Sequence, residues 1–142
     1  ALDIPPDGDV LRDLLAHDLD WVCAIAGATP TQVDILDARR HYERFEAIRC
    51  RLRFPNGMDV DVSASRIATR VERAVHVAGQ GVLPLEDLQA DPDTLALQMR
   101  AFLRACDDER TPLASLEQAF SLHRLIERIE QAACEHEAAR AA

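Results

Sequence analysis

The chain has 142 residues, 48% hydrophobic and 29% charged, with a net charge of −9 at pH 7. This length fits one domain with its own core, and the composition excludes a disordered protein. The negative charge argues against nucleic-acid binding, which depends on clustered positive charge. No apolar run approaches the roughly 20 residues that span a membrane, and the first residues do not form a secretory signal. We therefore expect a cytoplasmic protein without nucleic-acid or membrane partners.

All 16 basic residues are arginine, so the chain has no lysine for a Schiff base or a phosphate-binding loop. The cysteines lie too far apart for a CxxC zinc or redox motif; they are Cys23, Cys50, Cys106 and Cys134. Because no export signal is present, we interpret them as reduced and mostly buried thiols.

The first predicted helix runs from Asp9 to Ala26, after an extended Pro-rich segment at residues 1–8. Asp9 is suited to cap its N-terminus, and Gly27 its C-terminus. Helical spacing predicts that one apolar face packs on the core, formed by Leu11, Leu14, Leu15, Val22 and Ile25.

The middle of the chain predicts a sheet. Strands are expected at Gln32–Tyr42, at Phe45–Phe54 and at Met58–Ala64, and the turn Pro55–Gly57 joins the last two. The alternation of the second strand places arginines on the outward face, beside aspartates of the third, which predicts cross-strand ion pairs. These residues are Arg49, Arg51, Arg53, Asp59 and Asp61. A further hairpin is expected from Val71–Ala78 and Val82–Leu85 around the turn Gly79–Gly81.

Two helices close the chain, one from Pro92 to about Asp107 and one from Ser115 to about residue 138. Their predicted apolar stripes are Leu95, Met99, Phe102 and Leu103 in the first, and Leu116, Ala119, Phe120, Leu122, His123, Ile126 and Ile129 in the second. His123 is interpreted as a core residue. The order of elements predicts an α+β fold, a mostly antiparallel open sheet with helices packed on one face, in a single domain spanning 1–142.

Polar residues on the first helix are the candidate site. Asp9, Asp13, His17 and Asp20 share one helical face. A carboxylate one turn before a histidine suits general acid–base catalysis. The same spacing also fits a pair of metal ligands, or an ordinary solvated face with a capping aspartate.

The order of motifs resembles the C-terminal domain of the glucose–fructose oxidoreductase/inositol dehydrogenase (Gfo/Idh/MocA) family. Residues 9–27 are similar to the helix that opens that domain, and Asp13 and His17 match its Asp and His. The similarity covers about residues 8–130 and continues through Leu52–Gly57, Val62–Arg66, Leu97–Cys106 and Pro112–Ile126. The strand ending at Arg66 resembles most the branch that acts on nucleotide-activated amino sugars.

The resemblance implies the substrate-binding and oligomerisation half of an NAD(P)-dependent dehydrogenase acting on a sugar or nucleotide-sugar hydroxyl. Asp13 and His17 would be catalytic, whereas Asp20 and Arg66 would bind substrate, Arg66 through an anion such as a phosphate. The family's Rossmann domain binds NAD or NADP and supplies a lysine, and nothing in this chain matches it.

We therefore expect no dehydrogenase activity from the isolated chain, and a Rossmann partner in cis or in trans. The chain would be an excised fragment, a stand-alone remnant or a subunit of a split enzyme. A homo-oligomer through the open sheet face is also expected. The alternative is a non-catalytic dimerising domain; a small metal enzyme built on the first helix is a third hypothesis.

Overall fold

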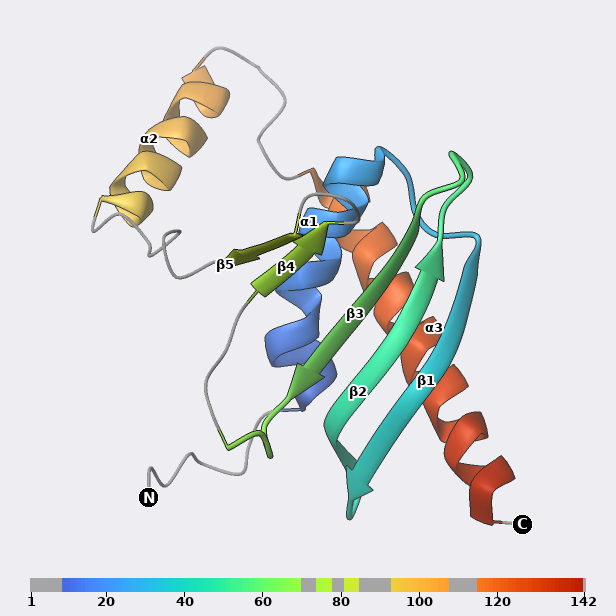
Figure 1. Cartoon of the computed structure of the whole chain (residues 1–142). Coiled ribbons are helices and arrows are strands. Elements are labelled where there is room, and N and C mark those ends of the chain that lie inside the picture. Colours follow the sequence, from blue (N-terminus) through green and yellow to red (C-terminus); the bar gives the residue numbers. More distant parts are fainter. Residues whose placement is uncertain (1–8, 70–73, 78–80, 85–92, 108–114, 142) are drawn as a thin grey trace. The chain divides into compact units, whose positions relative to one another are not determined.

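The computed structural model describes residues 9–69, 74–77, 81–84, 93–107 and 115–141 (Figure 1). The segment predicted to be extended, residues 1–8, lies outside them. The chain divides into two compact units, Ala1–Ile67 with Glu117–Ala142, and Ala68–Leu116. The candidate site belongs to the first unit.

The first helix begins with a π-helical turn, η1 (Leu11–Leu15), and continues as α1 (Ala16–Ala26). The Asp9 carboxylate accepts a hydrogen bond from the Leu11 backbone N–H at 2.8 Å. Gly27 ends the helix in the left-handed conformation, with φ of 66°. Both predicted caps are thus confirmed.

The buried face of this helix differs from the prediction. Leu11, Leu15 and Leu19 are fully buried, whereas Leu14 is 41% and Ile25 is 72% exposed. In the π-helical turn the Ala16 N–H bonds to the Leu11 carbonyl, five positions back, and this widens the turn. Residues four apart therefore align on the core, and Leu14, three positions after Leu11, turns away. The prediction that Leu14 and Ile25 face the core was wrong, because it assumed a regular α-helical period along the whole helix. Ile25 lies three turns after Leu14, on the same side of the helix.

The sheet of this unit has three antiparallel strands in the order β1-β2-β3. They are β1 (Gln32–His41), β2 (Arg44–Arg53) and β3 (Asp59–Ser65), which confirms the three predicted strands. The pairing of β1 with β2 has two register shifts, one between Ile35 and Asp37 and one between Arg39 and Arg40. Both lie in or next to the charged part of β1. Tyr42 was predicted to end the strand, but it opens the turn to β2 with φ of 55°, as a two-residue hairpin turn requires.

The predicted β2–β3 turn is confirmed. The Phe54 N–H bonds to the Met58 carbonyl at 2.9 Å, and Gly57 lies between them with φ of 84°, the left-handed position of a three-residue hairpin loop. Asn56 Oδ1 accepts a hydrogen bond from the Met58 backbone N–H at 3.0 Å, and Asn56 Nδ2 donates one to the Ala26 carbonyl at 3.3 Å. The turn is thereby tied to the end of α1.

Helix α3 (Leu116–Ala141) lies with α1 on one face of this sheet (Figure 1). Together they enclose a core whose larger buried side chains include Leu11, Leu15, Leu19, Phe45, Ile48, Leu52, Leu125 and Ile129. The Arg128 guanidinium donates to the carbonyls of Pro30 and Thr31 at 3.1 and 3.3 Å, which ties α3 to the start of β1. The predicted α+β arrangement, with helices on one face of an open antiparallel sheet, is confirmed.

The stripe predicted for the last helix is only partly correct. Ile126 and Ile129 are buried, but Leu116 is 87% and Phe120 is 56% exposed. Ala119 is exposed as well. His123 was interpreted as a core residue and is half-exposed, 3.3 Å from the Glu127 carboxylate. The apolar residues of α3 keep their helical spacing beyond the part of the helix that covers the sheet. A prediction from this spacing alone therefore assigned the exposed residues to the core.

The second unit contains the antiparallel pair β4 (Ala74–Val77) and β5 (Gly81–Pro84), and the helix α2 (Thr94–Asp107). The predicted hairpin and helix are confirmed over these residues, except that Gly81, which was predicted to lie in the turn, begins β5. Pro92, the predicted outer ends of the two strands and the Leu95 side chain lie outside the described part. The other members of the predicted α2 stripe are more than half exposed; they are Met99, Phe102 and Leu103.

No helix in the described part of the chain is long and apolar enough to cross a membrane. All four cysteines are free thiols. Cys50 is buried and Cys106 is exposed, so the prediction of mostly buried thiols holds for Cys50 and fails for Cys106. Burial first, and the nearby Asp61 carboxylate second, raise the pKa of Cys50 to about 12, which keeps it a neutral thiol and unsuited to nucleophilic chemistry.

Candidate functional site

An ion pair between Asp13 and Arg66 joins the first helix to the end of the sheet. Arg66 Nη2 donates to Asp13 Oδ2, although 53 positions separate the two residues in the chain. Asp13 lies within the π-helical turn η1, and Arg66 directly follows β3. The π-helical turn is itself informative, because such turns occur frequently at functional sites.

His17 lies four positions after Asp13 and is exposed. Within the described residues its ring makes no hydrogen bond or ion pair. The structure gives Asp13 the Arg66 guanidinium as its partner and shows no bond between Asp13 and His17. Because part of the π-helical turn lies between them, the two side chains are not related by a regular α-helical step.

The other acidic residues of this helix have separate positions. Asp9 caps the Leu11 N–H. Asp20 is exposed, and its charge adds to burial, the larger cause, in raising the pKa of the Cys23 thiol. Across the residues that the structure describes, no three His, Cys, Asp or Glu side chains converge as metal ligands do.

The described residues do not fit a dinucleotide cofactor. Such cofactors are held by a parallel βαβ unit with a glycine-rich first turn. Each strand pair in the described ranges is antiparallel. The two glycines with positive φ in these ranges, Gly27 and Gly57, end a helix and close a hairpin.

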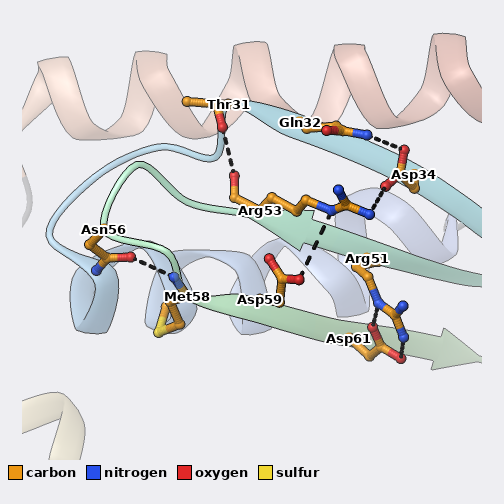
Figure 2. Close-up of polar contacts among 9 residues, drawn as sticks. All are labelled: Thr31, Gln32, Asp34, Arg51, Arg53, Asn56, Met58, Asp59 and Asp61. Atoms are coloured by element: carbon orange, nitrogen blue, oxygen red, sulfur yellow. Dashed lines mark hydrogen bonds and ion pairs between the residues drawn. The ribbon is translucent and has the colours of Figure 1, made fainter.

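The outward face of the sheet carries the predicted arginines and aspartates, of which Figure 2 shows Arg51, Arg53, Asp59 and Asp61. Arg51 donates to both oxygens of Asp61, at 2.6 and 3.0 Å, and Arg49 reaches the same carboxylate at 3.2 Å. Arg53 lies 3.5 Å from Asp34 and 4.0 Å from Asp59. The hydrogen bond from Arg51, its largest cause, lowers the pKa of Asp61. The predicted cross-strand charge pairing is confirmed.

Replacing Asp61 with Asn is expected to lower the thermal unfolding midpoint by a few degrees at most at pH 7, because exposed ion pairs contribute little. A lowered carboxyl pKa stabilises the fold above the ordinary value of 3.8 and loses that effect as the pH falls through the folded value. The difference between wild type and Asp61→Asn should therefore shrink in acid. The check is thermal unfolding from pH 7 down to pH 2, with Asp59→Asn as the control, since the longer Asp59 contact predicts a smaller effect. A difference that persists undiminished at the acid end would contradict this.

A shallow, open hollow lies between β1 and α3, lined by Val33, Arg128, Gln131, Ala132 and Glu135. None of the predicted site residues lines it. Of the predicted site residues, the structure brings together Asp13 and Arg66, and it leaves His17 exposed on the same helix as Asp13.

Sequence reasoning placed Asp13, His17 and Asp20 on one helix, but it missed the Asp13–Arg66 pair and the π-helical turn. Arg66 was singled out as an anion ligand, and the structure shows a protein carboxylate as its partner. Helical spacing relates residues within a few turns of each other, so it carries no information about a partner 53 positions away.

The fold is similar to two crystal forms of UDP-N-acetylglucosamine 3-dehydrogenase GnnA from Acidithiobacillus ferrooxidans. The TM-scores are 0.77 and 0.72, each at 20% sequence identity and covering 89% of this chain. The chain spans about half of those proteins, 48% of their length. No protein-family model matches the chain, and no curated protein matches its sequence. The similarity therefore concerns the fold.

Proposed function

We propose that this chain is the substrate-binding, C-terminal domain of an NAD(P)-dependent dehydrogenase of the Gfo/Idh/MocA family, acting on a hydroxyl of a nucleotide-activated sugar. The observation that carries the proposal is the match of 89% of the chain to half of a sugar-nucleotide dehydrogenase. The motif order from Asp9 to Ile126 points to the same family independently of the fold.

In this proposal His17 is the general base. Its exposed ring accepts the proton of the reacting hydroxyl, while the C–H bond at the same carbon breaks and leaves a ketone. Asp13 acts beside it on the same helix, and Asp20 contacts the substrate one turn further on. For Arg66 the sequence predicts the role of a substrate-anion ligand, but its guanidinium meets the Asp13 carboxylate, so that role is not part of this proposal.

The hydride acceptor belongs to a different domain. NAD or NADP supplies hydride acceptance in this class of reaction, and the described residues offer no site for it. We therefore propose a Rossmann domain as the partner of this chain, in cis or in trans, and no turnover by these 142 residues alone.

The outward sheet face favours a second candidate function, a dimerising interaction domain without catalysis. Three arginines and three aspartates alternate across β1, β2 and β3 in matched numbers; they are Arg49, Arg51, Arg53, Asp34, Asp59 and Asp61. A charge-balanced face of this kind can meet a twofold copy of itself without net repulsion. The same face would serve as the oligomer contact of the dehydrogenase.

One purification separates these candidates. The protein is captured from its native source with an antibody against this chain, and its subunits and its mass are measured. NAD(P) reduction with UDP-N-acetylglucosamine and related nucleotide sugars is then assayed. Activity is expected. We also expect either a polypeptide of more than twice 15.8 kDa, with the Rossmann domain fused to this chain, or a second subunit that is the Rossmann domain.

The recombinant chain serves as the inactive control. A single 15.8 kDa species that forms dimers, without a dinucleotide-binding subunit and without activity, would overturn the dehydrogenase proposal and support the dimerising domain. Turnover by the recombinant chain alone would contradict the assignment of the cofactor to another domain.

A further inference from the structure

We propose that Arg66 is a positioning residue, which holds the carboxylate of Asp13, one of the two proposed catalytic residues, in a fixed position, and that it is not a ligand of the substrate. This inference rests on the proposed function, since it assigns a role within the same site. It is carried by the ion pair between Asp13 and Arg66 and by the way each end of that pair is fixed.

Arg66 is anchored by the sheet. Its backbone N–H donates to the Glu46 carbonyl at 2.8 Å, which extends the β2–β3 ladder one residue beyond β3. Its side chain is only 24% exposed, although arginine is among the residues most often found at the surface. The guanidinium is therefore presented from a fixed backbone position and is largely screened from water.

Asp13 is anchored by the helix. Its backbone N–H donates to the Asp9 carbonyl at 3.0 Å, and Asp9 in turn caps Leu11. Its side chain is 45% exposed, so without a partner the carboxylate would be free to change rotamer in solvent. Among the described residues, the Arg66 contact ties this side chain to a second element of the fold.

The surroundings of Arg66 Nε and Nη2 argue against a substrate anion. Nε is buried and has no hydrogen-bond partner among the described residues. A ligand cannot reach it without displacing the side chain, and Nη2 is already engaged by Asp13. An arginine placed to bind phosphate presents its fork of donors toward the ligand. Here one arm of the fork, Nη2, meets a protein carboxylate, and Nε is left without a partner among the described residues.

The first test measures the Asp13 side chain directly. In the uniformly ¹³C,¹⁵N-labelled chain, three-bond couplings from the Asp13 carboxyl carbon to its backbone nitrogen and carbonyl carbon report the χ1 rotamer populations. One dominant rotamer is expected in the wild type, averaging among rotamers in Arg66→Ala, and partial recovery in Arg66→Lys, which keeps the charge but not the fork.

Arg12→Gln is the matched control. Arg12 precedes Asp13 in the same turn and forms an exposed 3.0 Å ion pair with Glu130 of α3. Arg12→Gln removes this ion pair between the first helix and α3 and leaves the Asp13–Arg66 contact intact. The three-bond couplings of Asp13 should therefore keep their wild-type values. A single Asp13 rotamer in Arg66→Ala would overturn the proposal, and so would averaging in Arg12→Gln as large as that in Arg66→Ala.

The second test uses the native enzyme with its dinucleotide-binding partner. Arg66→Ala should lower kcat by roughly 100-fold with little change in KM, the size expected when a catalytic group is displaced by about 1 Å. In an Asp13→Asn background the same substitution should have no further effect. A substrate-anion ligand would instead raise KM and add its effect to that of Asp13→Asn, and this result would overturn the proposal.

The two tests fail separately. If no variant and no wild-type preparation turns over nucleotide sugars, the proposed function fails. The rotamer result is measured without substrate and still decides whether Arg66 holds Asp13.

Discussion

Replacing His17 with Ala is expected to lower kcat of the native dehydrogenase by about 10²–10⁴-fold, the usual contribution of a general base. The side chain is exposed and makes no hydrogen bond within the described residues. Its removal should therefore leave the fold and dinucleotide binding nearly unchanged. Steady-state turnover with a nucleotide sugar, the dinucleotide dissociation constant and the thermal midpoint together check this expectation.

His123→Ala is the matched control for this substitution. His123 is also an exposed histidine on a helix of the first unit, and it lies near Glu127 on α3. Its removal should leave turnover at the wild-type level. Normal turnover in His17→Ala would exclude His17 from catalysis, whereas a large loss of thermal stability would assign it a structural role instead.

Local features of the fold could be predicted because their signals lie within a few residues of one another. The Asn56–Gly57 dipeptide, the capping Asp9 and the terminal Gly27 each act on the backbone beside them. The alternation along β2 likewise fixed which of its side chains face outward, and the ion pairs of Arg51 and Arg53 confirm that face. These features need no knowledge of the partner element.

Predictions failed where a distant element decides the outcome. Periodicity identifies an apolar stripe, but it does not show how much of a helix the sheet covers, and so Leu116 and Phe120 were placed in the core. The π-helical turn had the same effect on Leu14. Leu11 and Leu15 of η1 are both buried, and apolar residues at this spacing also fit a regular α-helix, so the sequence does not mark the π-helical turn.

The candidate site shows the same division. Asp13 and His17 were singled out because their spacing along one helix brings a carboxylate near an imidazole. The role of Arg66 depends on the end of β3 lying against the first helix, which is a property of the tertiary structure. For this reason the sequence yielded the chemical groups of the site, and only the structure yielded the carboxylate–guanidinium pair among them.

Leu15→Ala is expected to destabilise the chain by about 2–5 kcal/mol, the range for a large side chain truncated in a core. Leu15 is fully buried at the end of the π-helical turn, within the core formed by the helices and the sheet. Urea unfolding followed by circular dichroism measures this loss, and an unchanged slope with denaturant would show that the two-state comparison is valid.

The neighbouring Leu14→Ala is the matched control, because it removes the same side chain at a position that is 41% exposed. Leu14→Ala should lower the free energy of unfolding by well under half as much as Leu15→Ala. The Leu14 side chain withdraws less apolar surface from water on folding, and its truncation leaves no closed cavity. Comparing Leu15→Ala with Leu14→Ala tests whether the first helix contains the π-helical turn. A regular α-helix is predicted from the sequence to bury Leu14, whereas the π-helical turn exposes it. Equal losses in both variants would show that the first helix lacks the wider turn in solution, and the position of Asp13 relative to Arg66 would then have to differ as well.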